Sequence, residues 1–159
     1  MRGITHLGAG VLVAVMMPNA GIGDFVGLIM GSVLPDIDSK TSIIGRYVPV
    51  LPKMIPHRTI THSLLMVAGA VLLSKSLGLG ILLHIVLDMF TTEGVPLFWP
   101  IKKKFRIPII AKKTKSGGWL DGCLGGVIWM ANIWLCWNLT LGADVNSWPW
   151  LHWFCQTTV

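Results

Sequence analysis

The chain is short of charged residues. Only 13% of its 159 residues are charged, whereas 53% are hydrophobic, and soluble domains usually have about 25% charged residues. So few charged side chains cannot cover a water-facing surface, which excludes an ordinary soluble domain and indicates extensive contact with lipid. The three cysteines lack the spacing of a metal finger, so a thiolate metal site is also excluded.

Acidic residues are scarce as well. Seven of them face thirteen lysines and arginines, and the formal net charge is +6. A basic balance would suit nucleic acid, but these cations lie in loops between apolar runs, where membrane topology explains them better. No nucleic acid partner is therefore expected. The length suits a single domain over residues 1–159, in which residues 106–159 hold a basic loop, a C-terminal apolar helix and a Trp-rich tail.

Long apolar runs are few. Gly122 to Leu141 has twenty uncharged residues, the length of one crossing of the hydrocarbon core. Runs of ten to fourteen residues suit re-entrant or interfacial helices too. With their polar ends included, the sequence predicts an all-α, polytopic membrane helical bundle of about five short helices. The four shorter runs are Leu7–Met17, Phe25–Leu34, Leu64–Leu73 and Leu77–Phe90.

The placement of lysine and arginine tests this arrangement. If the basic loop from Lys102 to Lys115 is cytoplasmic, five alternating helices put twelve of the thirteen cationic residues on the cytoplasmic side, and Lys75 is the exception. We therefore expect a multi-pass protein.

Histidines and aspartates gather at the cytoplasmic ends of these helices. Singly, each has an ordinary explanation as a packed, capping or interfacial residue, but ionisable groups near hydrocarbon are costly and usually functional. Mixed imidazole and carboxylate ligands suit zinc, manganese or another first-row ion, and seven candidates exceed the four ligands of one zinc. We therefore expect two divalent ions that share a carboxylate. The candidate metal ligands are His6, Asp36, Asp38, His57, His62, His84 and Asp88.

The spacing of the aspartates suggests their roles. His84 and Asp88 are four residues apart and share one helix face, so Asp88 either binds the ion or orients the imidazole. Pro35 stops a helix and leaves Asp36 and Asp38 on a tight loop, where they can bridge two ions. By contrast, three other aspartates at predicted helix ends are interpreted as caps or boundary residues: Asp24, Asp121 and Asp144.

The segment around the second histidine pair adds two candidates for chemistry. His57 and His62 are five residues apart, so we expect His57 in a loop and His62 in the first helical turn, with Thr61 as N-cap. Arg58 is a candidate to bind a phosphate oxygen, because guanidinium matches phosphate bidentately. Glu93 lies on the same membrane face and is either a general base or a loop residue.

The motifs in order resemble the YdjM family. The resemblance covers about residues 1–105 and implies a helical, LexA-regulated, metal-dependent hydrolase of the bacterial inner membrane, from a bacterium or a phage, in which the same seven histidines and aspartates are the ligands. The family is also distantly similar to zinc-dependent phospholipases C and single-strand nucleases, which suggests phosphoesters by analogy. The matching motifs are Thr5-His6 with Gly8 and Gly10, Leu34 to Asp38, His57 to Ser63, His84 to Asp88 and Gly94 to Pro100.

These features predict a phosphoesterase that acts on a lipid or lipid-linked phosphate at the cytoplasmic leaflet, since a site at headgroup level meets headgroups first. Lys102, Lys103, Lys104 and Arg106 either attract anionic lipid or only set the topology. Two alternatives remain open: a metal ion transporter, whose ligands would lie near the midplane, and a non-enzymatic modulator of a host complex in which metal staples helix ends together. The short helices also leave association into a homo-oligomer open.

Overall fold

The computed structural model describes residues 1–17, 19–40, 42, 45–47, 57–107 and 115–142, with side chains as far as residue 139. Asp144, the expected Trp-rich tail and part of the basic loop lie outside these residues. Within them the chain forms five α-helices and no strand beyond an isolated bridge between Val95 and Phe105, so the all-α prediction is confirmed. The helices are α1 (Gly3–Met16), α2 (Ile22–Val33), α4 (Leu64–Leu73), α5 (Lys75–Met89) and α7 (Trp119–Gly142), with 3₁₀ turns η1 (Leu34–Asp38) and η2 (Ile60–His62).

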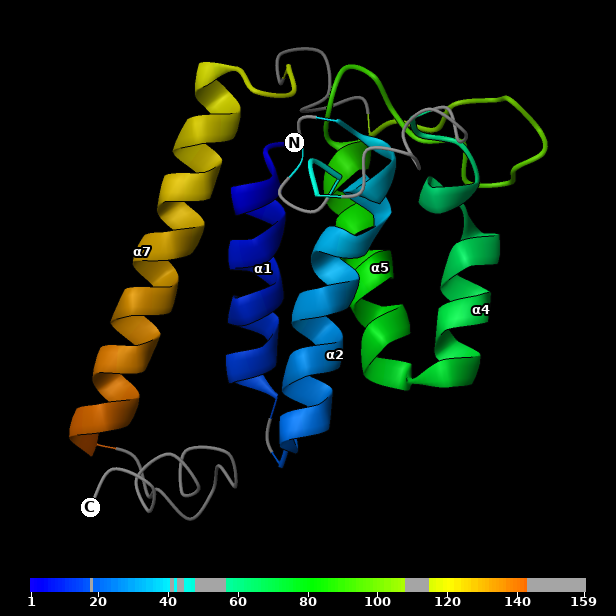
Figure 1. Ribbon diagram of the computed structural model, residues 1–159. Coiled ribbons are helices and arrows are strands. Elements are labelled where there is room, and N and C mark those ends of the chain that lie inside the picture. The colour runs from blue at the N-terminus through cyan, green and yellow to red at the C-terminus, as the bar shows by residue number, and fades with distance from the viewer. Residues whose placement is uncertain (18, 41, 43–44, 48–56, 108–114, 143–159) are drawn as a thin grey trace.

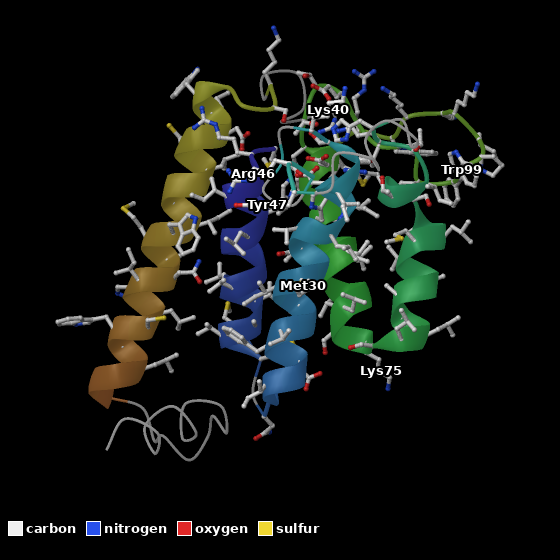
Figure 2. All side chains as sticks on the ribbon, in the orientation of Figure 1. Met30, Lys40, Arg46, Tyr47, Lys75 and Trp99 are labelled. Carbon is white, nitrogen blue, oxygen red and sulfur yellow. The ribbon has the colours of Figure 1, made fainter. Side chains whose placement is uncertain are left out.

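The helices stand side by side with their axes roughly aligned (Figure 1). In contact order α7 packs on α1, α1 on α2, α2 on α5 and α5 on α4. Both 3₁₀ turns and the loop that follows α5 lie at one end of the bundle (Figure 1). Lys75 begins α5 at the opposite end from Lys40, Arg46 and Trp99 (Figure 2), as the count of cationic residues predicts.

Helix length limits what can cross a bilayer. With a rise of 1.5 Å per residue, the 14 residues of α1 span about 21 Å, against about 30 Å of hydrocarbon. Among the described helices, the stretch Trp119–Leu139 of α7 is the one long and apolar enough to cross by itself, while α1 and α4 are apolar but shorter. The multi-pass topology therefore stays a prediction.

Apolar side chains nevertheless cover the outside of the bundle. Leu72 and Leu73 of α4 are 89% and 82% exposed, and Trp134 of α7 is 67% exposed. Exposed apolar surface on this scale marks a protein or membrane contact, which agrees with the expectation that lipid surrounds these helices.

Two glycines allow α2 and α5 to approach closely. A Cβ atom on Gly31 would stand 3.0 Å from the Cα of Gly80, and a Cβ on Gly80 would stand 2.9 Å from the Cα of Gly31. Small residues at such crossings let helix backbones touch. The close crossing brings Ser32, one residue further along α2, against His84 of α5. Beneath the site, Ile81 and Ile85 form the buried core with Ala70 and Val95.

Candidate metal centre

Four segments bring titratable side chains together at one end of the bundle. They are the first turn of α1, the turn η1, the segment 57–62 and the last turns of α5. Pro35 sits at the start of η1, and it ends α2 because its ring cannot continue the helical hydrogen bonds. Asp36 and Asp38 are two apart in a 3₁₀ turn, about 240° around its axis, so their side chains face different neighbours.

The inner cluster joins three imidazoles and two carboxylates. The Nε2 atoms of His62 and His84 lie 3.3 Å apart, and Asp36 Oδ1 lies 3.8 Å from the first and 3.6 Å from the second. Asp88 contributes Oδ2 at 3.6 Å from His62 Nε2 and Oδ1 at 3.3 Å from His6 Nε2. Ligand atoms at about 2.1 Å from a tetrahedral ion lie about 3.4 Å from one another, so these spacings are those of neighbouring ligands.

Burial makes this cluster costly unless something binds it. The side chains of His6, His62 and His84 are fully buried and Asp88 is 1% exposed. Neither ring nitrogen of His6 makes a well-formed hydrogen bond among the described residues, although Nε2 lies 3.3 Å from Asp88 Oδ1, and an unsatisfied buried polar group costs about 1–3 kcal/mol. A divalent ion bound at Nε2 would give that nitrogen a full partner, so the residues present fit a metal.

A backbone contact fixes the orientation of His84. Its Nδ1 lies 2.7 Å from the carbonyl oxygen of Ser32, so Nδ1–H donates to that carbonyl and Nε2 keeps its lone pair for a ligand. Histidines that bind metals are usually oriented by such a bond. The sequence gives no signal for Ser32, because the contact depends on the crossing of α2 and α5.

The possible ligands divide into three groups of three, and the donor atoms within each group lie within 4.8 Å of one another. Three residues belong to two groups each: Asp36, His62 and His84. A carboxylate shared between two ions, as predicted for this turn, fits the position of Asp36. The groups are His6–Asp36–His84, Asp36–His57–His62 and His62–His84–Asp88.

Asp38 lies one layer further out. Its Oδ1 is 2.5 Å from His57 Nδ1, and its Oδ2 accepts hydrogen bonds from the Arg58 backbone N–H, at 3.0 Å, and from the Thr61 hydroxyl. These contacts suit a residue that orients ligands, and its predicted role as a ligand stays a prediction. The prediction that Thr61 is a helix N-cap is wrong: Thr61 lies in η2, and α4 begins only at Leu64.

These contacts and burial shift the pKa values of Asp38, His57 and Asp36. Burial acts to raise the pKa of Asp38, but hydrogen bonds from His57, His62 and Thr61 outweigh burial and hold that pKa well below its usual range. The same bond to Asp38 raises the pKa of His57. Burial raises the pKa of Asp36 and outweighs the opposing electrostatic effects of His6 and His62.

Arg58 and Glu93 meet at the wall of a cavity. Arg58 is 6% exposed, and its Nη2 lies 2.7 Å from Asp88 Oδ2 while its Nη1 lies 3.0 Å from Glu93 Oε2. Its backbone is left-handed, with φ of 59°, a strain that clusters at functional sites. Asp36 and His57 also line this cavity, whose volume is about 460 Å³. Arg58 thus holds Asp88, and its binding of phosphate stays a prediction.

Two carboxylates, those of Asp121 and Asp88, fix the start of α1, which carries His6. The carboxylate of Asp121 in α7 accepts from the Arg2 backbone N–H at 2.7 Å and from the Thr5 hydroxyl at 3.1 Å. It also accepts from Gly117 N–H at 2.8 Å, so it is a boundary residue, as expected, that in addition ties α7 to α1. The Met1 amino group lies 2.5 Å from Asp88 Oδ1. Sequence reasoning missed these ties, because they join residues more than eighty positions apart.

Known proteins match most of the chain. The YdjM inner membrane proteins of Escherichia coli (strain K12) and Shigella flexneri are each 31% identical over 126 residues, which cover 67% of this chain and 63% of the relative. The uncharacterized protein YvsG of Bacillus subtilis (strain 168) is 32% identical over 97 residues, or 52% of this chain and 61% of the relative. The chain thus spans less than two thirds of the length of these relatives. No solved structure shows a significant match.

The family model extends further than the motifs. It matches residues 1–151, which include α7, a helix that no recognised motif reaches. The names of the relatives support a location in the bacterial inner membrane. By this match, and as its motifs predict, the chain belongs to the YdjM inner membrane protein family.

Proposed function

We propose that this protein is a membrane-bound, metal-dependent hydrolase that cleaves a phosphoester bond in a lipid or lipid-linked phosphate at the cytoplasmic leaflet. The observation that supports this most strongly is the buried cluster of imidazoles and carboxylates at ligand-to-ligand spacing, beside a polar-walled cavity. Two divalent ions, zinc or manganese, would supply Lewis acidity and an activated water at neutral pH.

The chain's own residues divide the remaining work. His6, His62 and His84 would hold the ions together with Asp88 and the shared carboxylate of Asp36. Further ordering comes from Asp38, which holds His57, and from Arg58, which holds Asp88. These fixed partners keep the donor atoms in place before substrate binds, so little reorganisation is needed during the reaction.

Glu93 is the candidate for proton transfer. Its side chain is 52% exposed and lines the cavity, so a water held there can reach its carboxylate. A substrate phosphate that enters the cavity would compete with Glu93 for the Nη1 of Arg58, since guanidinium pairs well with phosphate. In that arrangement Glu93 is freed to accept a proton while Arg58 remains fixed by Asp88.

The membrane setting supports a lipid substrate. The exposed leucines and tryptophans of α4 and α7 suit contact with acyl chains, and the basic segment at the end with the site suits the cytoplasmic side. A site at that end of short helices lies near the headgroups, where phosphates of lipids are concentrated.

Hydrolysis by purified protein tests the proposal. In detergent with Mn²⁺ or Zn²⁺, the protein should release phosphate or a phosphorylated headgroup from at least one of a panel of phospholipids and lipid-linked phosphates. Asp36→Ala should lose that activity, whereas Asp24→Asn, which changes a carboxylate at the other end of the bundle, should retain it. Equal turnover by Asp36→Ala would refute the role assigned to the cluster.

A metal staple is the second candidate, because the ligands come from the ends of several helices. Such a protein would bind metal and lose stability when the metal is removed, yet hydrolyse no member of the panel. A transporter is less well supported, since the cluster lies at one end of the bundle and not midway along it. Metal uptake into proteoliposomes without hydrolysis would favour transport.

A further inference from the structure

A second pocket shares two lining residues, His57 and Arg58, with the cavity at the metal centre. Its volume is about 250 Å³, and its lining includes His57, Arg58, Thr59, Trp99, Lys102 and Lys104. No acidic side chain is among the described residues that line it. Arg58 is already balanced by Asp88 and Glu93, so the two lysines bring positive charge without a matching carboxylate in the pocket.

Backbone hydrogen bonds anchor the segment that carries the lysines. Phe105 pairs with Val95 through two backbone hydrogen bonds of 2.8 and 3.0 Å, which anchors the segment that precedes it. Lys102 and Lys104 line the pocket, whereas Lys103 between them places its ammonium 5.8 Å from the centroid of the Phe105 ring.

The two cavities share one wall. His57 and Arg58 line both the larger cavity at the metal ligands and the smaller lysine pocket. Asp38 holds these two residues in place, because its carboxylate contacts His57 Nδ1 and accepts a hydrogen bond from the backbone N–H of Arg58. A ligand that bridges the wall would therefore put one anionic group at the metal ligands and a second beside the lysines.

We infer that the lysine pocket binds a second phosphate of the substrate, so that the substrate class is a diphosphate ester. This inference rests on the hydrolytic centre of the proposed function, and it makes the bond cleaved the phosphoanhydride bond of a diphosphate ester in place of a phosphoester bond. Water adds to the terminal phosphorus, the bond from that phosphorus to the bridging oxygen breaks, and the proton of the water goes to the departing monophosphate ester. Lys102 and Lys104 stabilise the negative charge that develops on the departing phosphate. The diphosphate can come from a lipid or from a soluble ester.

Binding of phosphonate analogues tests this inference without turnover. The probes are a prenyl methylenediphosphonate, whose bridging carbon resists hydrolysis, and the matching prenyl monophosphonate, with excess Mg²⁺ so that the probes do not strip ions. Wild-type protein should bind the diphosphonate at least about tenfold more tightly. The double variant Lys102→Gln/Lys104→Gln should lose this preference, and the matched control Lys103→Gln should keep it.

A third probe, methylenediphosphonate without the prenyl chain, distinguishes the two sources. Much weaker binding than the prenyl analogue indicates a lipid diphosphate, and equal binding indicates a soluble one. The inference is overturned if wild type shows no preference, if Lys103→Gln loses it equally, or if the double variant weakens only binding to vesicles rich in phosphatidylglycerol. If the protein hydrolysed lipid monophosphates but did not prefer the diphosphonate, the second phosphate site would be refuted and the proposed function would stand. If it preferred the diphosphonate but hydrolysed no substrate, the proposed function would be refuted and the second phosphate site would stand.

Discussion

The two ends of the helical bundle use polar residues differently. At the end where α5 begins, Asp24 accepts hydrogen bonds from the Gly21 N–H and the Ser76 hydroxyl, and Ser74 caps α5 by accepting from Leu77. At the other end, His6 is fully buried, and neither ring nitrogen makes a well-formed hydrogen bond among the described residues, although Asp88 Oδ1 lies 3.3 Å from Nε2. Capping accounts for the contacts of Asp24 and Ser74 at the first end, whereas the buried histidines and aspartates at the second end could hold a metal ion, as we propose.

Among the changes proposed here, loss of a metal ligand should have the largest effect, and the quantity affected is metal affinity. His62 belongs to two of the three ligand groups, so we expect His62→Ala to weaken metal affinity by more than about 100-fold, beyond what loss of an orienting partner costs. Inductively coupled plasma mass spectrometry of the purified proteins measures their metal content and checks this expected loss. If His62→Ala kept the metal content of wild type, the two ends would not differ as described.

Asp38→Asn separates an orienting residue from a ligand. Because Asp38 contacts His57, Thr61 and the Arg58 backbone, we expect metal affinity to fall about 10–100-fold. Competition with a fluorescent chelator measures the change. A loss as large as that of His62→Ala would instead make Asp38 a ligand, as the sequence predicts.

The helix crossing behind the site can be tested with two glycines. We expect Gly80→Ala to lower the free energy of unfolding by about 1–3 kcal/mol, as overpacking does, because its Cβ would meet the Gly31 backbone. A Cβ atom on Gly69 would meet no atom of the described residues within 4 Å, so Gly69→Ala should be neutral or stabilise by up to about 1 kcal/mol. Unfolding in detergent measures both variants, and equal effects would contradict the close crossing.

The smallest effect is expected at the capping end. Asp24→Asn removes a charge from the start of α2 and should cost at most about 1 kcal/mol of stability, within the range for helix caps. Metal content should not change. A fall in bound metal in this variant would show that the two ends are coupled and would weaken the comparison.

The sequence predicts the helices well because their signals are local. α4 occupies its predicted range, Leu64–Leu73, and the other helices begin two to four residues before the predicted apolar runs. The cationic residues also predict that the candidate ligands lie together at one end and Lys75 at the other. Six of the seven ligands come together in the groups described above, and Lys75 lies at the opposite end from Lys40 and Arg46 (Figure 2).

The geometry of the site could not be predicted in the same way. The contact between His62 and His84 joins residues 22 positions apart, and it depends on how the turn η2 is placed against α5. Thr61 has the residue type of a cap, but a 3₁₀ turn directs it to Asp38 instead. The ion pair of Arg58 with Asp88 likewise needs the tertiary packing of a loop on a helix.

X-ray absorption at the metal edge of the purified protein tests the central claim most directly. Our account predicts about two ions per chain, ligated by imidazole nitrogen and carboxylate oxygen at about 2.0–2.2 Å, with no sulfur. The imidazole contribution should fall in His62→Ala and remain in Asp24→Asn. A metal-free protein, or an ion bound without imidazole, would contradict the account.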